Sequence, residues 1–139
     1  MSDAENPLDP FKRATTATIR AIAGDDELDV TFGAGPPVVR GSTLRLPLPS
    51  VGANQSEIDA VRGVGDEFAL RFRHHDARLH ARYSPDGGPA QEMFEWIESA
   101  RIASIGAMRM QGVAQNLDAH LEVQCKQAAF DTITAETEA

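Results

Sequence analysis

Residues 56–83 read SEIDAVRGVGDEFALRFRHHDARLHARY and place apolar or small residues at helical spacing over their whole length. Ser56 with acidic residues in the following turn is typical of a helix start, and the Ser-Pro-Asp-Gly-Gly run at 84–88 is typical of a helix end. The stripe that recurs every three or four positions is Val61, Gly65, Phe68, Phe72, His75, Leu79 and Tyr83. We therefore predict one long helix from Ser56 to about Tyr83, with this stripe facing the core.

The same spacing predicts three further helices. Asp9-Pro10 begins the first as an N-cap followed by proline, and Gly24 ends it. Another begins near Pro89 and is expected to be central to the core. Its apolar side consists of Met93, Ile97, Ala100, Ser104 and Met108, widened by Phe94 and Trp96. Gly112 separates it from a last helix with Val113, Leu117, Leu121, Cys125 and Ala128 inward. The pattern thus predicts a four-helix domain.

Residues 28–48 alternate with a period of two instead. The alternating residues are Leu28, Val30 and Phe32, followed after a glycine- and proline-rich break by Leu44, Leu46 and Leu48. Pro47 has no N–H to donate to a sheet, so the second strand is expected at a sheet edge. We predict a small antiparallel β-ribbon against the helices and a mainly α fold of the α+β class. Residues 1–9 are expected to be a mobile tail, 10–131 the domain, and 132–139 a frayed end.

Length and composition limit the possible functions. A chain of 139 residues is long enough for one domain with its own core. The net charge of −8 opposes nucleic-acid binding, although ten of the 13 lysines and arginines lie in residues 1–83. No apolar run fits a membrane span or a signal peptide, so we expect a cytoplasmic protein without a membrane partner. The single cysteine, Cys125, excludes an internal disulfide and is expected to be a buried, unreactive thiol.

His74-His75-Asp76 and His80 are the candidate metal ligands, because clustered histidine and aspartate side chains can bind a metal. No GxGxxG, Walker A, HExxH or CxxC motif is present, which removes the stronger signals for nucleotide, zinc or redox chemistry. On one continuous helix, His75 and His80 would lie about 140° apart and His74 and His80 about 120° apart, so no two would share a face. We therefore predict no metal site here. The expected roles are structural, with His75 hydrogen-bonded in the core and Asp76 paired with His80 one turn later.

Basic side chains on the same predicted helix are candidate partner-binding residues. Arg71, Arg78 and Arg82 fall, together with His74, within about 80° of arc beside the apolar stripe. Such an arc could attract an acidic protein or the carboxylates of a small ligand, and a solvated helix face is the simpler interpretation.

A second candidate contact lies earlier on this helix. Arg62 and Asp66 stand four residues apart, which fits either a surface salt bridge or a charged contact at a subunit seam. Gly65 falls on the buried stripe, where glycine costs on the order of 1 kcal/mol of helix stability relative to alanine. We therefore expect Gly65 to allow close approach of another backbone.

Three blocks of the sequence resemble, in order and spacing, the N-terminal region of the CobT subunit of aerobic, ATP-dependent cobaltochelatase. They are DPFKRATT at 9–16 through RAIAGD at 20–25, RGVGD at 62–66 through ALR at 69–71 to HDARLH at 75–80, and GVAQNL at 112–117. The resemblance covers nearly the whole chain. It implies that residues 132–139 begin an acidic linker to a von Willebrand factor A-like domain. The magnesium site of the family belongs to that domain, so no metal ligand carries over.

The resemblance also implies a function in cobalamin biosynthesis. The CobT subunit joins an AAA+ ATPase subunit, and together they drive the large chelatase subunit to insert cobalt(II) into hydrogenobyrinic acid a,c-diamide. ATP, magnesium and cobalt belong to that complex, and no catalytic or cofactor-binding residue maps to this chain. We expect a non-catalytic assembly module, inactive alone and of open oligomeric state. The alternative is a domain that binds cobalt or a corrinoid carboxylate through Arg71, Arg78, Arg82 and the histidines.

Overall fold

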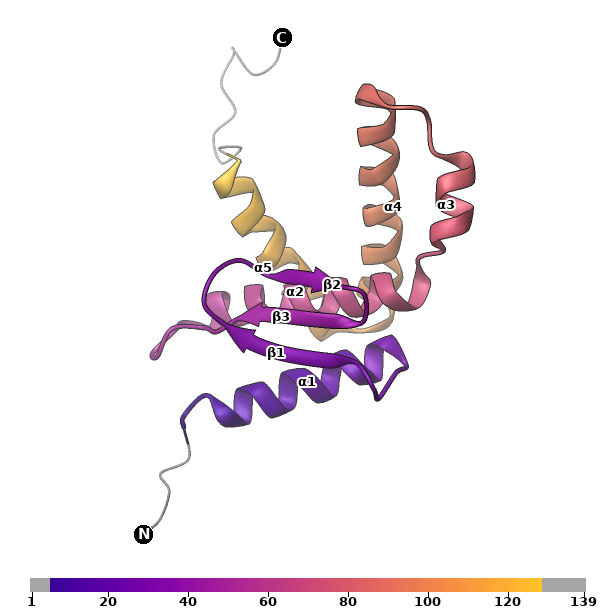
Figure 1. The fold of residues 1–139 in the computed structure, drawn as a ribbon. Helices are drawn as coiled ribbons and strands as arrows, with labels where there is room; N and C mark the ends of the chain where they lie inside the picture. The colour runs from indigo at the N-terminus through magenta and orange to yellow at the C-terminus, as the bar shows by residue number, and fades with distance from the viewer. Residues whose placement is uncertain (1–5, 129–139) are drawn as a thin grey trace, which may run out of the picture.

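The computed structural model describes residues 6–128, which form five helices and a three-stranded sheet (Figure 1). The helices are α1 (Asp9–Ala23), α2 (Gln55–His74), α3 (Ala77–Tyr83), α4 (Gly88–Arg109) and α5 (Gln111–Gln127), and the strands are β1 (Asp29–Gly33), β2 (Val38–Arg40) and β3 (Thr43–Pro47). The mainly helical class with a small sheet is confirmed, but the predicted number of helices is wrong. No helix in this range is long and apolar enough to cross a membrane. The expected tail at 1–9 lies partly, and the expected frayed end at 132–139 wholly, outside the described residues.

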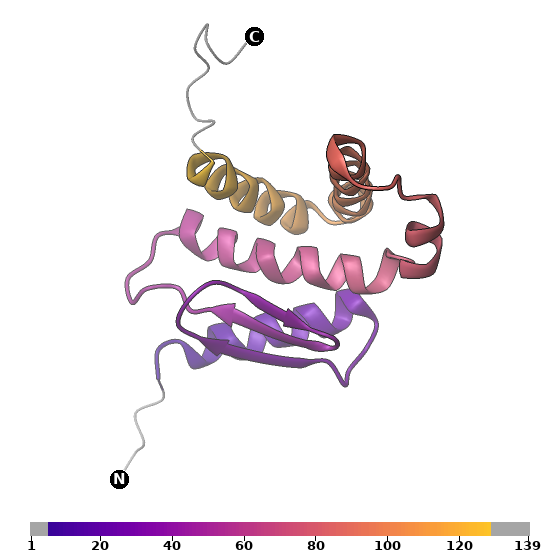
Figure 2. The ribbon, with the colours of Figure 1, turned by 45° about the horizontal axis from the view of Figure 1, so that its top comes forward.

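Helix α2 lies in the middle of the molecule, with the sheet and α1 on one side and α4 and α5 on the other (Figure 2). The largest fully buried side chains come from all of these layers: Ile19, Leu28, Leu44, Leu46, Leu70 and Ile102. Because neighbours cover two sides of α2, its buried residues spread beyond one stripe. They are Ala60, Gly63, Gly65, Asp66, Phe68, Ala69 and Leu70. The predicted stripe is therefore too narrow for the first part of α2.

Local capping residues determine where α1 ends and where α2 begins. Gly24 ends α1 as predicted, with a left-handed φ of 71° that glycine adopts without strain. Leu8, and not Asp9, is the N-cap of α1, and no side chain caps that end. Helix α2 begins with a capping box, in which the side chain of Asn54 accepts from the backbone N–H of Glu57 and the Glu57 carboxylate accepts from the N–H of Asn54.

The sheet is mixed, in the order β1-β3-β2, so the predicted antiparallel ribbon is wrong. Strands β1 and β3 pair in parallel, with Val30 opposite Leu44. Strand β2, which the sequence pattern did not indicate, pairs antiparallel with β3 after a tight turn that places Gly41 at a φ of 58°. Strand β3 is therefore central and not at an edge. Pro47 is tolerated there because it is the last residue of the strand.

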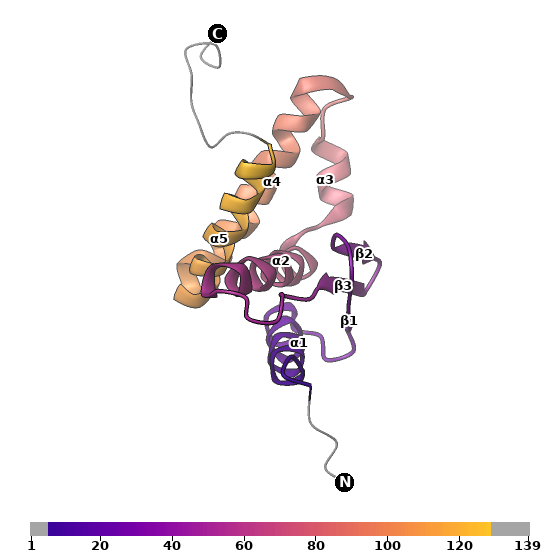
Figure 3. The same cartoon turned by 90° about the vertical axis from the view of Figure 1, so that its left-hand side faces the viewer.

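The predicted single helix over 56–83 is two helices, because the helical conformation is interrupted at residues 75–76. His75 adopts extended angles (φ −87°, ψ 128°), and Asp76 is the N-cap of α3. The Asp76 carboxylate accepts a hydrogen bond from the backbone N–H of Leu79 at 2.9 Å. An aspartate side chain offers the backbone this alternative partner and so favours a helix start over a helix interior. After the break, α3 runs beside α4 (Figure 3).

Helix α4 is not central to the core, contrary to the prediction. Its buried residues are Ile102 and Gly106, both in its C-terminal half. The N-terminal half extends past α2 beside α3 (Figure 1). The apolar side chains of α4 are largely exposed, with Met93 at 62%, Trp96 at 69%, Ile97 at 60% and Met108 at 88%. A helical apolar spacing thus marks a face that residues 6–128 leave exposed.

The structure also differs from the prediction at three residues of the apolar stripe and at the boundary before the last helix. Phe72, Leu79 and Tyr83 are exposed, since α2 ends soon after Phe72 and α3 takes another direction. Gly112 lies inside α5, and Met110 is the boundary between α4 and α5. Among the predicted inward residues of α5, Val113 is buried and Leu121 and Ala128 are exposed.

Candidate functional site

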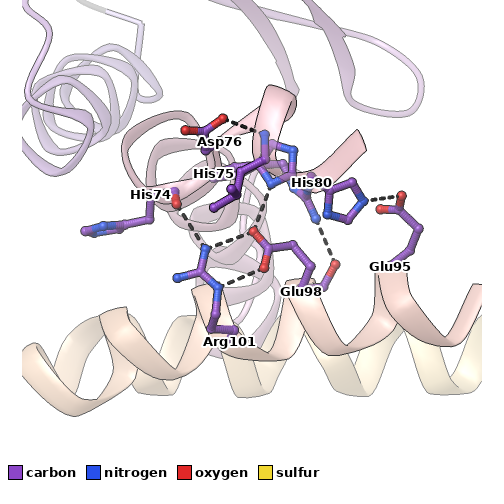
Figure 4. A network of polar contacts seen from close by, with 10 residues as sticks. His74, His75, Asp76, His80, Glu95, Glu98 and Arg101 are labelled. Carbon is purple, nitrogen blue, oxygen red and sulfur yellow. Dashed lines mark hydrogen bonds and ion pairs between the residues drawn. The ribbon is translucent and has the colours of Figure 1, made fainter. Parts of the chain in front are cut away.

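Polar side chains from α2, α3 and α4 meet at the break between α2 and α3 (Figure 4). The break brings His75 and His80 side by side, with ring centroids 4.9 Å apart. His75 Nδ1 lies 2.9 Å from Glu98 Oε1, and His80 Nε2 lies 2.6 Å from Glu95 Oε1. Both glutamates belong to α4. These contacts tie α3, which has no buried residue, to its neighbour.

Arg101 completes the cluster from one turn further along α4. Its Nε donates to Glu98 Oε2 at 2.8 Å, and its Nη2 donates to Glu98 Oε1 at 2.9 Å and to the backbone carbonyl of His74 at 3.0 Å. The hydrogen bonds from Arg101, assisted by His75, lower the pKa of Glu98 to about 2. Glu98 is therefore ionised at neutral pH. Arg101 also satisfies a carbonyl at the C-terminal end of α2.

The centre of the cluster is partly shielded from solvent. The side chains of His75, His80 and Glu98 are 18%, 13% and 15% exposed, whereas Glu95 and Arg101 are about half exposed. Partial burial strengthens electrostatic interactions relative to water while small ions still have access. The arrangement places two imidazoles beside two carboxylates, a set of groups that can pair with one another or bind a cation.

The prediction that the histidines diverge is wrong for His75 and His80, because it assumed one continuous helix. His74 does stand apart, with its imidazole pointing away from the cluster (Figure 4). The predicted pairing of Asp76 with His80 is also wrong, since the Asp76 carboxylate caps α3 and His80 pairs with Glu95. His75 is half-buried beside a carboxylate and does not lie in the apolar core.

The predicted basic arc is divided between two helices. Arg71 of α2 is directed toward α4, where its Nη2 donates to Ser99 Oγ at 2.8 Å. Arg78 and Arg82 lie on α3 and are exposed, and the Arg82 guanidinium lies over the ring of Tyr83 at 5.6 Å from the centroid. Arg71 thus joins two helices, whereas the other two arginines present their charge to solvent. A partner-binding role for these arginines stays a prediction.

Arg62 and Asp66 do not form the predicted surface pair. Asp66 is 2% exposed and accepts a hydrogen bond from Asn116 Nδ2 of α5 at 2.7 Å. Burial raises the pKa of Asp66 to about 6, against the lowering effects of that hydrogen bond and of the Arg62 charge. Arg62 lies 3.8 Å from Asp59 and over the ring of Phe11. Asp66 therefore lies in a seam within the chain, between α2 and α5.

Close approach of another backbone occurs at Gly63 and not at Gly65. A β-carbon at Gly63 would overlap the backbone carbonyl of Asn116 on α5. At Gly65 a β-carbon would meet the side chain of Ile19 at 2.7 Å. Both glycines therefore serve packing, but only Gly63 sets the distance between two helix backbones.

A groove of about 690 Å³ lies between α4 and α5. Its walls include the apolar and small side chains of Trp96, Ala100, Ala103, Ala107, Leu117, Leu121 and Cys125. Cys125 is a free, half-buried thiol and so is not fully buried as predicted. Sequence reasoning placed Trp96 and Leu121 in the core, whereas both are mostly exposed on this groove.

Sequence reasoning does not identify Glu95, Glu98 and Arg101 as site residues. Their spacing of three places them along one side of α4, and this is the signal that could have indicated a charged face. Their partners lie 15 to 27 residues earlier in the chain. Only the tertiary arrangement of α3 beside α4 brings the two groups together.

By its fold and site, the molecule is a mainly helical α+β domain with a half-buried histidine–carboxylate cluster and an open apolar groove. Its sequence matches the family model described as "Cobalamin biosynthesis protein CobT" over residues 5–139. The chain therefore belongs to the CobT family, as the resemblance implied, and has a role in cobalamin biosynthesis. No solved structure matches this chain.

Proposed function

We propose that this chain is a non-catalytic assembly module of a cobaltochelatase CobT subunit. It binds the AAA+ ATPase and large chelatase subunits and so supports the ATP-driven insertion of cobalt(II) into hydrogenobyrinic acid a,c-diamide. The observation that carries this proposal is the apolar surface around the groove between α4 and α5, which residues 6–128 leave exposed. Large apolar side chains exposed together on a folded domain are typical of contact surfaces for other proteins.

The composition of this surface fits a protein contact. Met93, Trp96 and Ile97 lie within one turn of each other on α4, and Trp96 also lines the groove. Tryptophan and methionine are enriched at protein interfaces, and tryptophan carries a large share of binding energy when a partner covers it. A groove between two helices can take the apolar face of a partner helix.

Exposed positive charge lies on the neighbouring helix α3. Arg78 and Arg82 project from a chain whose net charge is −8. A local positive area on an acidic protein attracts an acidic partner and affects the rate of encounter more than the final contact area. The arginines of α3 would therefore steer a partner subunit toward the α4–α5 groove.

The alternative function is a domain that binds a corrinoid carboxylate or cobalt, and its corrinoid-carboxylate form fits these contacts less well. Arg71 already donates to Ser99, and His75 and His80 already face glutamates of α4. A ligand carboxylate would have to replace an internal carboxylate at each histidine. Binding experiments distinguish the two functions, because only the assembly function predicts binding when a partner subunit is added to this chain.

Co-purification of groove variants with the partner subunits tests the proposal. The double variant Trp96→Ala/Leu121→Ala should weaken binding at least about ten-fold, because it removes two large apolar side chains that are exposed on the groove. Met108→Ala is the matched control, since Met108 is more exposed on the same helix but does not line the groove. Circular dichroism verifies folding. Undiminished binding of the double variant would exclude the groove as the contact surface.

Charge reversal tests the role of α3. Arg78→Glu/Arg82→Glu should slow association at low salt, and the difference from wild type should shrink as ionic strength rises. Arg71 is left unchanged because its hydrogen bond to Ser99 lies within the fold. Arg40→Glu/Arg45→Glu, on the strands β2 and β3, is the matched reversal of two exposed arginines elsewhere. Equal slowing by both variants would show a general charge effect and contradict steering by α3.

A further inference from the structure

We propose that His75, His80 and Glu98 form a binding site for one divalent transition-metal ion. One nitrogen of each imidazole and one carboxylate oxygen of Glu98 all lie within 4.8 Å of one another. The three residues come from the end of α2, from α3 and from α4 (Figure 4). A metal ion there would join all three helices at the break.

The donor set indicates the class of metal. Two imidazole nitrogens and one carboxylate oxygen suit borderline ions such as Zn²⁺ and Co²⁺, whereas Mg²⁺ and Ca²⁺ prefer oxygen ligands alone. Ligands about 2.1 Å from a tetrahedral ion lie about 3.4 Å from one another. His75 Nδ1 and Glu98 Oε1 are already 2.9 Å apart, so the ion would take the place of the hydrogen between them. Three protein ligands leave at least one coordination position open.

The surroundings of the three ligands fit this role. Arg101 holds both oxygens of Glu98 and can keep its bond to Oε2 when Oε1 turns to a metal. Glu95 holds Nε2 of His80 at 2.6 Å, as carboxylates do for the second nitrogen of metal-bound histidines. Positioned carboxylates and limited exposure distinguish this cluster from exposed surface histidines.

Another histidine of the chain provides a comparison within the same molecule. His120 of α5 pairs with Glu67 of α2, with Nε2 3.2 Å from Oε2, and is as little exposed as the proposed ligands. No second histidine joins that pair among the metal-ligand clusters of residues 6–128. His120 is therefore a control for the metal affinity of a single, partly buried histidine–glutamate pair outside the proposed site.

Titration of the full 139-residue chain with Co²⁺ tests the proposal, because the visible absorption of Co²⁺ reports its ligands. We expect one ion per chain, with intensified bands of four- or five-coordinate Co²⁺ that Zn²⁺ displaces and Mg²⁺ does not. His80→Gln and Glu98→Gln should each weaken binding about ten-fold or more, and His120→Gln should leave it unchanged. Absent bands, or equal weakening by His80→Gln and His120→Gln, would overturn the site.

A measurement on the wild-type chain keeps the test decisive if a variant fails to fold. Zn²⁺ added to the unaltered protein should shift the imidazole NMR signals of His75 and His80 and leave those of His74 and His120 in place. Shifts at His74 or His120 without shifts at His75 and His80 would overturn the proposal. The site is independent of the proposed assembly function, since neither Trp96 nor Leu121 contributes a ligand.

Discussion

The middle of α2 and the segment that follows α2 are joined to the rest of the molecule in different ways. The middle of α2 meets α5 through buried contacts, where Gly63 admits the backbone of Asn116 and Asp66 accepts a hydrogen bond from the side chain of the same residue. Beyond α2, α3 and the first half of α4 are held to each other by the partly exposed imidazole–carboxylate pairs of the cluster, and α3 buries no residue. The seam between α2 and α5 is therefore part of the buried interior, whereas the arm, formed by α3 and the first half of α4, is largely exposed.

The largest contrast is expected between two isoleucines of α4. Ile102 is 1% exposed and Ile97 is 60% exposed, although both belong to one helix. Ile102→Ala should lower the free energy of unfolding by about 3–4 kcal/mol, because it leaves a cavity in the core. Ile97→Ala should change it by less than about 0.5 kcal/mol. Chemical denaturation of both variants measures the difference in the free energy of unfolding. Similar losses would show that Ile97 is packed in the core as Ile102 is.

Gly63→Ala should destabilise the protein nearly as strongly. The added methyl group would overlap a backbone carbonyl of α5, which cannot move aside as a flexible side chain can. The expected loss is about 2–3 kcal/mol. Gly112→Ala, inside α5 with open space around it, should instead stabilise by up to about 1 kcal/mol through helix propensity. If thermal unfolding ranks the two variants in the opposite order, the tight seam is refuted.

Asp66 makes the seam sensitive to pH. Its pKa is raised from 3.8 to about 6, so the folded state binds the proton more tightly than the unfolded state. Its contribution to stability is therefore full below about pH 4 and is lost as pH rises through 6. Asp66→Asn stays neutral and should be more stable than wild type by about 2–3 kcal/mol at neutral pH, from about 1.4 kcal/mol per pKa unit.

Denaturant unfolding of wild type and Asp66→Asn at about pH 4, 5.5 and 7 checks this sign. The difference between the two proteins isolates Asp66 from other groups, including Glu98, whose lowered pKa acts in the opposite direction. The difference should grow with pH over this range. A constant difference would mean that Asp66 is not protonated preferentially in the folded state.

The smallest effect is expected in the arm. Asp76→Ala removes the N-cap of α3 and should cost about 1 kcal/mol, confined to local opening of that helix. Asp76→Asn keeps an acceptor for the N–H of Leu79 and should cost little. Amide hydrogen exchange should become faster in α3 and stay unchanged in α2. Faster exchange throughout α2 and α5 would show that arm and seam are one cooperative unit.

Several features of the fold follow from local chemistry and were predictable. Gly24 ends the first helix, Pro89 lies at the start of α4, and the two alternating runs are strands. Strand direction was not predictable, because alternation shows which residues face the core but not how two strands pair. The connecting strand β2 has only three residues and no clear alternation of its own.

The site was less predictable than the fold. Apolar spacing continues through His75, Leu79 and Tyr83, so periodicity alone conceals a break that the Asp76 cap produces. The same spacing in α4 describes an uncovered face as well as it describes a core face. Glu95 and Glu98 become partners of the histidines only because α3 runs beside α4, and helical spacing within one segment carries no information on that arrangement.

Hydrogen exchange of this chain, alone and bound to its partner subunits, tests most directly whether the arm and its groove are the binding region. We predict new protection in α3 and along the groove side of α4 and α5, with α1 and the three strands unchanged. The structural reason is that the exposed Trp96 and Leu121 lie on that groove. Protection confined to α1 or the sheet, with α3 and α4 exchanging as in the free chain, would contradict binding at the arm and the groove.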